Sequence, residues 1–221
     1  MTALFRIAVL KMFSLPHAKP FMQQGVKTDM GPTSAPDTDA QLMLRVRDGD
    51  GASFALLLEK HRTSVIHFLY RMVQDFAIAE ELGQEVFLRV YRSRATYEPT
   101  AKFTTWLFRI ATHLALNWLR DGKNERGQER LDQEMEGSPA IQVSDRKPTV
   151  ESRMVYEVKL NEIRGAIASL PDKQRAAVLM HKYDEMEYSQ IAGVLSCTES
   201  AVKSLLFRAY ETLRARLAHM A

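Results

Sequence analysis

The sequence is poor in the features that mark secreted, metal-binding and membrane proteins. Its 221 residues include one cysteine, Cys197, which excludes a disulfide framework and a cluster of thiolate metal ligands. No apolar run approaches the roughly 18 residues that a membrane-spanning helix needs. The apolar start is interrupted by Arg6 and Lys11, so we expect no signal peptide there. These absences favour a cytoplasmic protein without direct membrane insertion.

An excess of charge of one sign is also missing. The formal net charge is +3, from 30 basic and 27 acidic residues. A nucleic-acid surface would therefore have to arise by sorting charges onto helix faces. The chain also lacks the two-residue alternation of strands and any long repeat, and its apolar residues recur at helical spacing instead. We therefore predict an all-α fold.

Composition divides the chain into four parts. Residues 1–38 end in a stretch rich in Gly, Pro, Ser, Thr and Asp and are predicted to be a disordered extension. Residues 39–121 carry an almost unbroken helical pattern. Residues 122–150 lack apolar periodicity and contain three glycines and two prolines, which predicts a flexible linker. Residues 151–221 form a second helical unit, so we expect two small helical domains joined by a tether.

The helix predicted over residues 102–121 has two dissimilar faces. Its apolar face carries both tryptophans of the chain and four aliphatic side chains: Trp106, Leu107, Ile110, Ala111, Leu114 and Trp118. The opposite stripe covers about 16 Å of helix and contains Arg109, His113, Leu116 and Arg120. A solvated face is the usual explanation of such a stripe. It is also long enough to follow several nucleotides of a nucleic-acid backbone.

Residues 188–217 have the form of a helix-turn-helix. The polar stretch "SCTES" separates two helical patterns, and Thr198 or Glu199 could cap the second helix. One face of that helix is predicted to be buried: Val202, Leu206, Ala209, Leu213 and Leu217. Its front presents the cation, hydroxyl and aromatic groups that major-groove reading needs: Ser200, Lys203, Ser204, Phe207 and Arg208. Helical hairpins are common, so this motif by itself leaves DNA binding open.

The motifs of residues 39–217 together resemble one family. "AEELGQEVFLRVYR" and "FTTWLFRIATHLALNWLR" are similar to region 2 of extracytoplasmic-function (ECF) sigma factors, the minimal two-domain initiation subunits of bacterial RNA polymerase. "LPDKQRAAVLMHKYDEMEYSQIAGVLS", followed by "AVKSLLFRA", is similar to their region 4. The motifs are in order and correctly spaced. The resemblance implies a region 2 helical bundle and a region 4 helix-turn-helix, joined by the linker.

The resemblance also implies three contact surfaces. The helix over residues 77–93 would bind the RNA polymerase core enzyme through a mixed polar face: Glu80, Glu81, Gln84, Leu88 and Tyr91. The alternative is that this face makes a second contact within the hydrophobic core of the protein itself. The following loop and helix would open and read the −10 promoter element: Tyr97, Lys102, Phe103, Arg109, His113, Asn117 and Arg120. The front of the helix-turn-helix would read the −35 element in duplex form. For Tyr97 and Phe103, a core role at the ends of the loop also stays open.

Two residues depart from the family pattern. Ser196 stands where the turn of the helix-turn-helix usually has glycine, and Leu205 stands where the recognition helix usually has arginine. We expect the fold to survive both changes, because Leu205 suits a core position. The missing arginine puts the usual set of −35 contacts in doubt, and Arg208 is the candidate to take over phosphate binding.

No enzyme chemistry is indicated. The six histidines show no paired metal spacing, and no glycine-rich phosphate loop is present, so we expect no cofactor, no metal and no small-molecule substrate. The resemblance implies a cognate anti-sigma factor as a further partner.

Two other hypotheses remain at this point. One is a helix-turn-helix regulator that binds DNA without being a polymerase subunit, and the other is a helical interaction protein that binds neither. Residues 77–121 discriminate a sigma factor from such a regulator, because a repressor needs no polymerase-binding helix and no melting loop.

Overall fold

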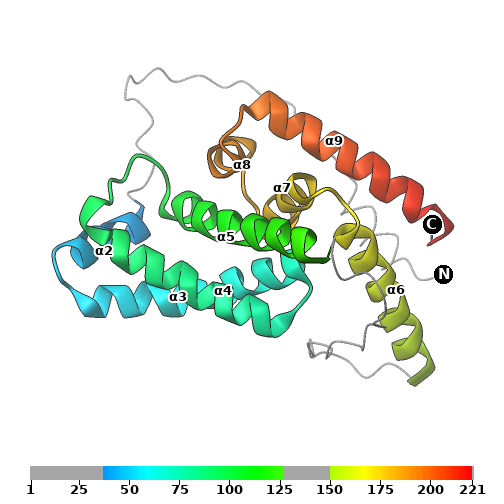
Figure 1. Cartoon of the computed structure of the whole chain (residues 1–221), viewed down its shortest axis with the longest axis horizontal. Helices are drawn as coiled ribbons and strands as arrows, with labels where there is room; N and C mark the ends of the chain where they lie inside the picture. Colours follow the sequence, from blue (N-terminus) through cyan, green and yellow to red (C-terminus); the bar gives the residue numbers. More distant parts are fainter. Residues whose placement is uncertain (1–36, 127–149, 221) are drawn as a thin grey trace, which may run out of the picture.

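The computed structural model describes residues 37–126 and 150–220, which form helices joined by short turns (Figure 1). Residues 1–36 of the predicted extension and residues 127–149 of the predicted linker lie outside this description. Within the described ranges no strand occurs, in agreement with the predicted all-α class. None of the helices in these ranges has the length and apolar character needed to cross a bilayer.

Four helices and one 3-10 turn form the first unit: α2 (Thr38–Arg47), α3 (Gly51–Val73), α4 (Phe76–Arg92), η1 (Ser93–Thr96) and α5 (Phe103–Arg126). Three of the helices begin after an aspartate whose carboxylate accepts backbone N–H groups, namely Asp37, Asp50 and Asp75. Aspartate is among the best residues at this position. Local sequence therefore sets where these helices start.

The helices extend slightly beyond the predicted limits of the first unit. α2 begins at Thr38 and is capped by Asp37, two residues that the sequence assigns to the extension. α5 continues through Gly122 to Arg126, into the predicted linker. A single glycine costs a helix only about 1 kcal/mol relative to alanine, so Gly122 does not end it.

The second unit contains α6 (Val150–Ala168), α7 (Asp172–Lys182), α8 (Tyr188–Leu195), α9 (Glu199–Arg216) and η2 (Ala218–Met220). Thr198 is the residue that caps α9, since its side chain accepts a hydrogen bond from the N–H of Ala201 at 3.2 Å. The predicted apolar face of α9 is buried along its whole length: Val202, Leu206, Ala209, Leu213 and Leu217. Leu205 is partly buried against the same core.

Ser196 occupies the turn between α8 and α9 in a left-handed conformation, with φ 51° and ψ 51°. A residue with a Cβ atom adopts this conformation at a cost of about 1–2 kcal/mol, which glycine avoids. The structure therefore explains why glycine is usual at this position and shows that the turn is kept with serine.

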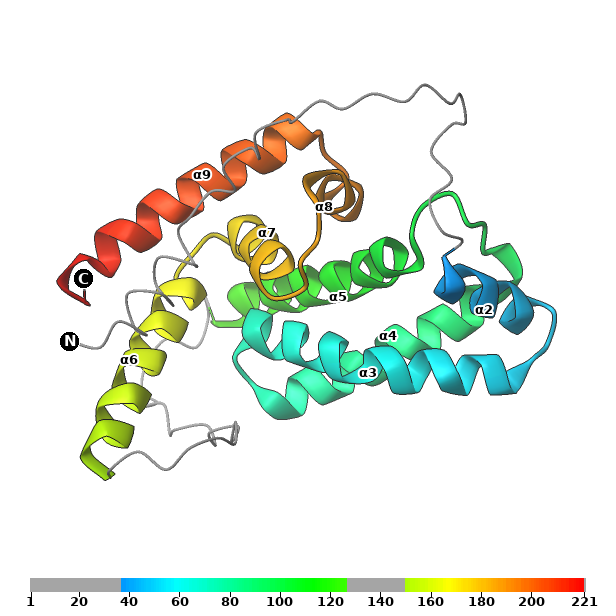
Figure 2. The ribbon, with the colours of Figure 1, turned by 180° about the vertical axis from the view of Figure 1, so that it is seen from behind.

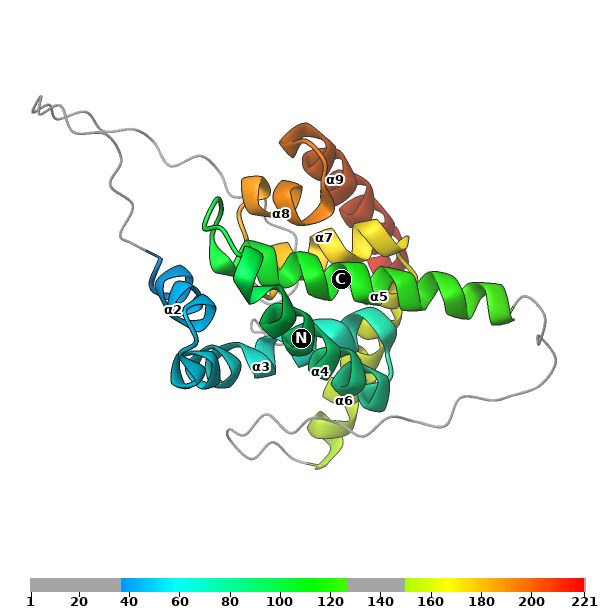
Figure 3. The same cartoon turned by 60° about the vertical axis from the view of Figure 1, so that its left-hand side comes forward.

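The two units pack against each other. α9 lies on the side of the molecule opposite α3 and α4, with α7 and α8 between α9 and α5 (Figures 1 and 2). α8 lies over α5 (Figure 3). The buried apolar side chains of both units belong to one continuous core. The sequence predicts two tethered domains but contains no indication of this contact.

Candidate functional site

The α4 surface is defined by the five residues that resemblance assigns to polymerase binding: Glu80, Glu81, Gln84, Leu88 and Tyr91. Leu88 and Tyr91 are 42% and 41% exposed, although both are large and apolar. The opposite side of the helix is fully buried at Ala79, Val86 and Val90. α4 therefore has one face in the core of the first unit and a second face that presents two apolar anchors to solvent.

The α4 surface is held in place by neighbouring side chains. The ring of Tyr91 lies 5.1 Å from that of Phe54, centroid to centroid, and the guanidinium carbon of Arg94 lies 4.1 Å from the Tyr91 centroid. Glu80 pairs with Arg62 of α3 at 3.8 Å. Beside this pair, a hollow of about 270 Å³ opens between α3 and α4 and reaches Gln84. The surface is thus shaped before any partner arrives.

The loop between η1 and α5 has buried ends and an exposed middle. Tyr97 is 4% exposed and Phe103 is fully buried, whereas residues 98–102 are exposed. Tyr97 packs on Trp106, with ring centroids 4.9 Å apart. Burial raises the pKa of Tyr97 to about 12, and the charges of Asp37 and Asp39 add to this. This burial favours the core role for Tyr97 and Phe103. The expectation that their rings stack on a base stays a prediction, and in this structure neither ring is exposed.

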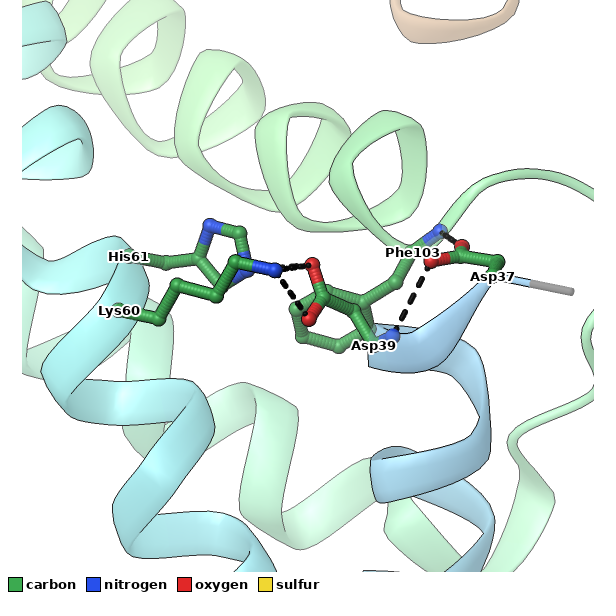
Figure 4. Close-up of polar contacts among 5 residues, drawn as sticks. All are labelled: Asp37, Asp39, Lys60, His61 and Phe103. Carbon is green, nitrogen blue, oxygen red and sulfur yellow. Dashed lines mark hydrogen bonds and ion pairs between the residues drawn. The ribbon is translucent and has the colours of Figure 1, made fainter. Parts of the chain in front are cut away.

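A polar network joins the start of α2 to the start of α5 (Figure 4). The N–H of Phe103 donates a hydrogen bond to Asp37 Oδ2 at 2.7 Å. Asp39 is buried, and its carboxylate accepts from Lys60 Nζ at 2.7 and 2.9 Å and lies 2.9 Å from His61 Nε2. None of these four polar side chains was singled out from the sequence. Asp39 and His61 are 22 positions apart, so no local spacing marks them as a pair.

The α5 stripe consists of Arg109, His113, Asn117 and Arg120, and the structure brings all four together on one exposed face of α5. Arg109 is engaged by the second unit, since its Nε and Nη2 atoms donate to the carbonyl of Gly193 in α8 at 3.0 and 2.5 Å. The other three stripe residues line a hollow of about 390 Å³ between α5 and the second unit. In this arrangement α8 partly covers the face predicted to meet the −10 element.

Cationic contacts hold the second unit against the end of α3. Arg175 is buried, and its Nη1 atom donates to the carbonyl of Met72 at 2.5 Å while its Nη2 atom reaches that of Leu170 at 3.2 Å. The guanidinium carbon of Arg71 lies 4.1 Å from the ring centroid of Tyr183. Burial raises the pKa of the neighbouring Asp184 to about 7, and the charge of Arg71 only partly offsets it. The sequence does not single out Arg175, because this side chain bonds across to the first unit at Met72 only when the two units pack against each other.

The α9 surface comprises Ser200, Lys203, Ser204, Phe207 and Arg208, and the structure leaves all five exposed within the first ten residues of α9. Phe207 is 66% exposed. Ser204 Oγ donates to the carbonyl of Ser200 at 3.0 Å, and Arg208 Nε donates to the carbonyl of Ser204 at 3.2 Å. Charge, hydroxyl groups and an aromatic ring therefore share one open helix face, as the sequence predicts.

Comparison with known families identifies both units. Residues 57–125 match the model of sigma-70 region 2, and residues 160–213 match that of sigma-70 region 4. The first match spans the α4 surface and the α5 stripe, and the second spans the α9 surface. The two regions that the sequence motifs suggest are therefore both present and in the expected order.

The ECF RNA polymerase sigma factor SigW of Bacillus subtilis is 30% identical over 177 residues, which cover 78% of this chain and 93% of SigW. This chain belongs to the ECF sigma factors. Two further relatives are each 29% identical to this sigma factor: the RNA polymerase sigma-H factor of Pseudomonas aeruginosa over 185 residues and the ECF sigma-E factor of Escherichia coli K12 over 177 residues. Each alignment covers 80% of this sigma factor and 92% of the relative.

Solved structures agree with the fold. The structure of CnrH in complex with the cytosolic domain of CnrY superposes with a TM-score of 0.63 at 17% identity and covers 84% of this sigma factor and 100% of CnrH. RpoE of Bartonella quintana in complex with the anti-sigma factor NepR gives a TM-score of 0.59 at 20% identity and covers 75% and 96%. As an ECF sigma factor the protein directs transcription initiation by binding core polymerase and promoter DNA, and it is not an enzyme.

Proposed function

We propose that the three surfaces divide the work of initiation among them. The α4 surface binds the core polymerase, the exposed loop 98–102 with the α5 stripe holds the melted −10 strand, and the α9 surface reads the −35 duplex. Tyr97 and Phe103 have no part in this proposal as base contacts. They hold the two ends of the loop.

The exposed loop carries the −10 part of the proposal. Five consecutive residues are open to solvent between two buried aromatic side chains, and Pro99 restricts the backbone within them. Lys102 supplies a positive charge at the point where the loop meets α5. A melted strand needs such a fixed polar platform, because unstacking a base costs a few kcal/mol that protein contacts must offset.

We propose two further properties for the sigma factor. The first is a cognate anti-sigma factor, which fits the presence of NepR and of the CnrY cytosolic domain in the two structures of similar fold. The second is a cytoplasmic location, where core polymerase and promoter DNA are found together.

An exchange of the loop tests the −10 assignment. Replacing residues 98–102 by the corresponding segment of another ECF sigma factor is expected to change which −10 base is preferred, because the loop supplies the contacts to the melted strand. Run-off transcription with core polymerase on a series of −10 point mutants measures the preference, and permanganate footprinting locates the melted bases.

Two binding measurements serve as controls for the loop exchange. Affinity for core polymerase and for a −35 duplex is expected to stay unchanged, because the α4 and α9 surfaces are left intact. Retention of the parental −10 preference at every position by the exchanged protein would show that the loop does not read this element.

A further inference from the structure

The first turn of α5 has no acidic residue of its own. Helix N-termini carry unpaired N–H groups and a partial positive charge, and an anionic acceptor stabilises them. Asp37, which lies 66 positions earlier, supplies that acceptor through its hydrogen bond from the N–H of Phe103 at 2.7 Å. The start of α5, and with it the end of the loop, is therefore attached to Asp37 at the start of α2.

The same carboxylate also caps α2. Asp37 Oδ1 accepts a hydrogen bond from the N–H of Asp39 at 3.2 Å, while Oδ2 accepts the bond from α5. One side chain thus serves the N-termini of two helices that are distant in sequence (Figure 4). Any change in the position of α2 is passed directly to the start of α5.

α2 is itself fixed to α3 by the buried carboxylate of Asp39. Lys60 and His61 of α3 both bind this carboxylate, and the ring of His61 lies 5.5 Å from that of Phe103, centroid to centroid. Phe103 is therefore held from two sides, by Asp37 at its backbone and by His61 at its ring. At the other end of the loop, the ring of Tyr97 lies 6.4 Å from that of Phe103.

We propose that Asp37 is a positioning residue for −10 recognition: it fixes the start of α5 so that the exposed loop 98–102 is presented in one conformation. This inference rests on the proposed role of the loop and extends it to a residue outside both matched regions, which begin at residues 57 and 160. Binding groups that are held before the ligand arrives discriminate better than mobile ones.

The test uses full-length sigma factor reconstituted with core polymerase. Asp37→Ala removes the caps of α2 and α5 together. We expect discrimination among −10 point-mutant promoters to fall by about twofold to thirtyfold, the range that corresponds to loss of one helix N-cap, while affinity for core polymerase stays unchanged. A smaller folded fraction would instead lower transcription from every promoter by the same factor.

Two more variants make the result decisive. Asp50→Ala removes the cap of α3, where the carboxylate accepts hydrogen bonds from Ala52 and Ser53 of the same helix, and is expected to leave the −10 preference intact. Asp37→Asn keeps one acceptor oxygen and is expected to give an intermediate loss. If the alanine variant does not fold, the asparagine variant tests the positioning role of Asp37 in its place.

The outcomes separate this inference from the proposed function. The positioning role is overturned if Asp37→Ala, or the asparagine variant in its place, lowers transcription uniformly or behaves like Asp50→Ala. If the loop exchange leaves the −10 preference unchanged while Asp37→Ala weakens it, the loop assignment fails, and Asp37 positions α5 and its stripe rather than the loop.

Discussion

Lys203 lies near the start of α9 with its side chain exposed, and no carboxylate pairs with it among the residues that the structure describes. Its neighbours on the α9 surface, Ser200 and Ser204, are linked to each other by a hydrogen bond along the helix. In a helix-turn-helix, the first residues of the second helix are those that reach base edges. We therefore expect Lys203 to discriminate between −35 sequences.

Replacing Lys203 by alanine is expected to weaken binding of the full-length sigma factor to a −35 duplex by about 1–3 kcal/mol, the value of a good bidentate base contact. The loss should be larger on the specific duplex than on a scrambled one. Arg216→Ala is the matched control, because it removes an exposed cation at the other end of the same helix.

Titration of both duplexes at several salt concentrations distinguishes a base contact from a phosphate contact at Lys203. An equal loss on the two duplexes, with the slope of log affinity against log salt reduced by about one, would assign Lys203 to a phosphate and contradict the base contact.

At the scale of one element, α4 has one side in the hydrophobic core and a second side that is open to a partner. Its buried side packs on α3 and α5, while Leu88 and Tyr91 stay exposed. Large apolar and aromatic side chains of this kind are the usual anchors of protein interfaces. Because Tyr91 is already held by Phe54 and Arg94, little of its freedom remains to be lost when a partner binds.

The double variant Leu88→Ala with Tyr91→Ala is expected to weaken binding to core polymerase by about 2–4 kcal/mol. Leu56→Ala removes another exposed leucine, 54% exposed on α3, and should leave the affinity unchanged. Fluorescence titration of core polymerase gives the affinities, and circular dichroism checks that each variant is folded. A folded double variant with wild-type affinity would refute the assignment of the α4 surface.

At the scale of the whole molecule, the packing of α8 on α5 competes with the proposed use of the α5 stripe. Arg109 commits the Nε–Nη2 edge of its guanidinium to the carbonyl of Gly193, so that edge is not open to a promoter phosphate in this arrangement. Gly193 makes this close approach possible, because a Cβ atom at its position would lie 3.2 Å from Thr105 Cγ2 of α5. A larger residue at position 193 would therefore push the units apart without entering the core of either one.

Gly193→Leu is expected to separate α8 from α5 and to raise affinity for a single-stranded −10 oligonucleotide. A tenfold increase would correspond to about 1.4 kcal/mol released from the contact between the units. Gly165→Leu on α6 is the control, since no atom lies within 4 Å of a Cβ placed there. Small-angle X-ray scattering should show a larger radius of gyration for the first variant only. Expansion without any gain in −10 affinity would show that α8 does not obstruct the DNA-binding face.

The sequence by itself determined the helices and the residues on each of their faces. Aspartate caps mark the starts of α2, α3 and α4, and apolar spacing correctly predicts which side of α9 is buried. Exposure of the α9 surface and of the α5 stripe follows from the same spacing. All of these features depend on residues within about four positions of each other, where helix geometry alone decides which side chains share a face.

Only the tertiary structure decided which residues meet between elements. It buried Tyr97 and Phe103, which the sequence left open between a core role and a role in DNA binding. It also placed Asp37 on the N–H of Phe103, Arg109 on the carbonyl of Gly193 and Arg175 on that of Met72. These contacts join residues 66, 84 and 103 positions apart. The spacing of residues along the chain does not predict these contacts. They form only when separate helices pack together and the polar groups buried between the helices require partners.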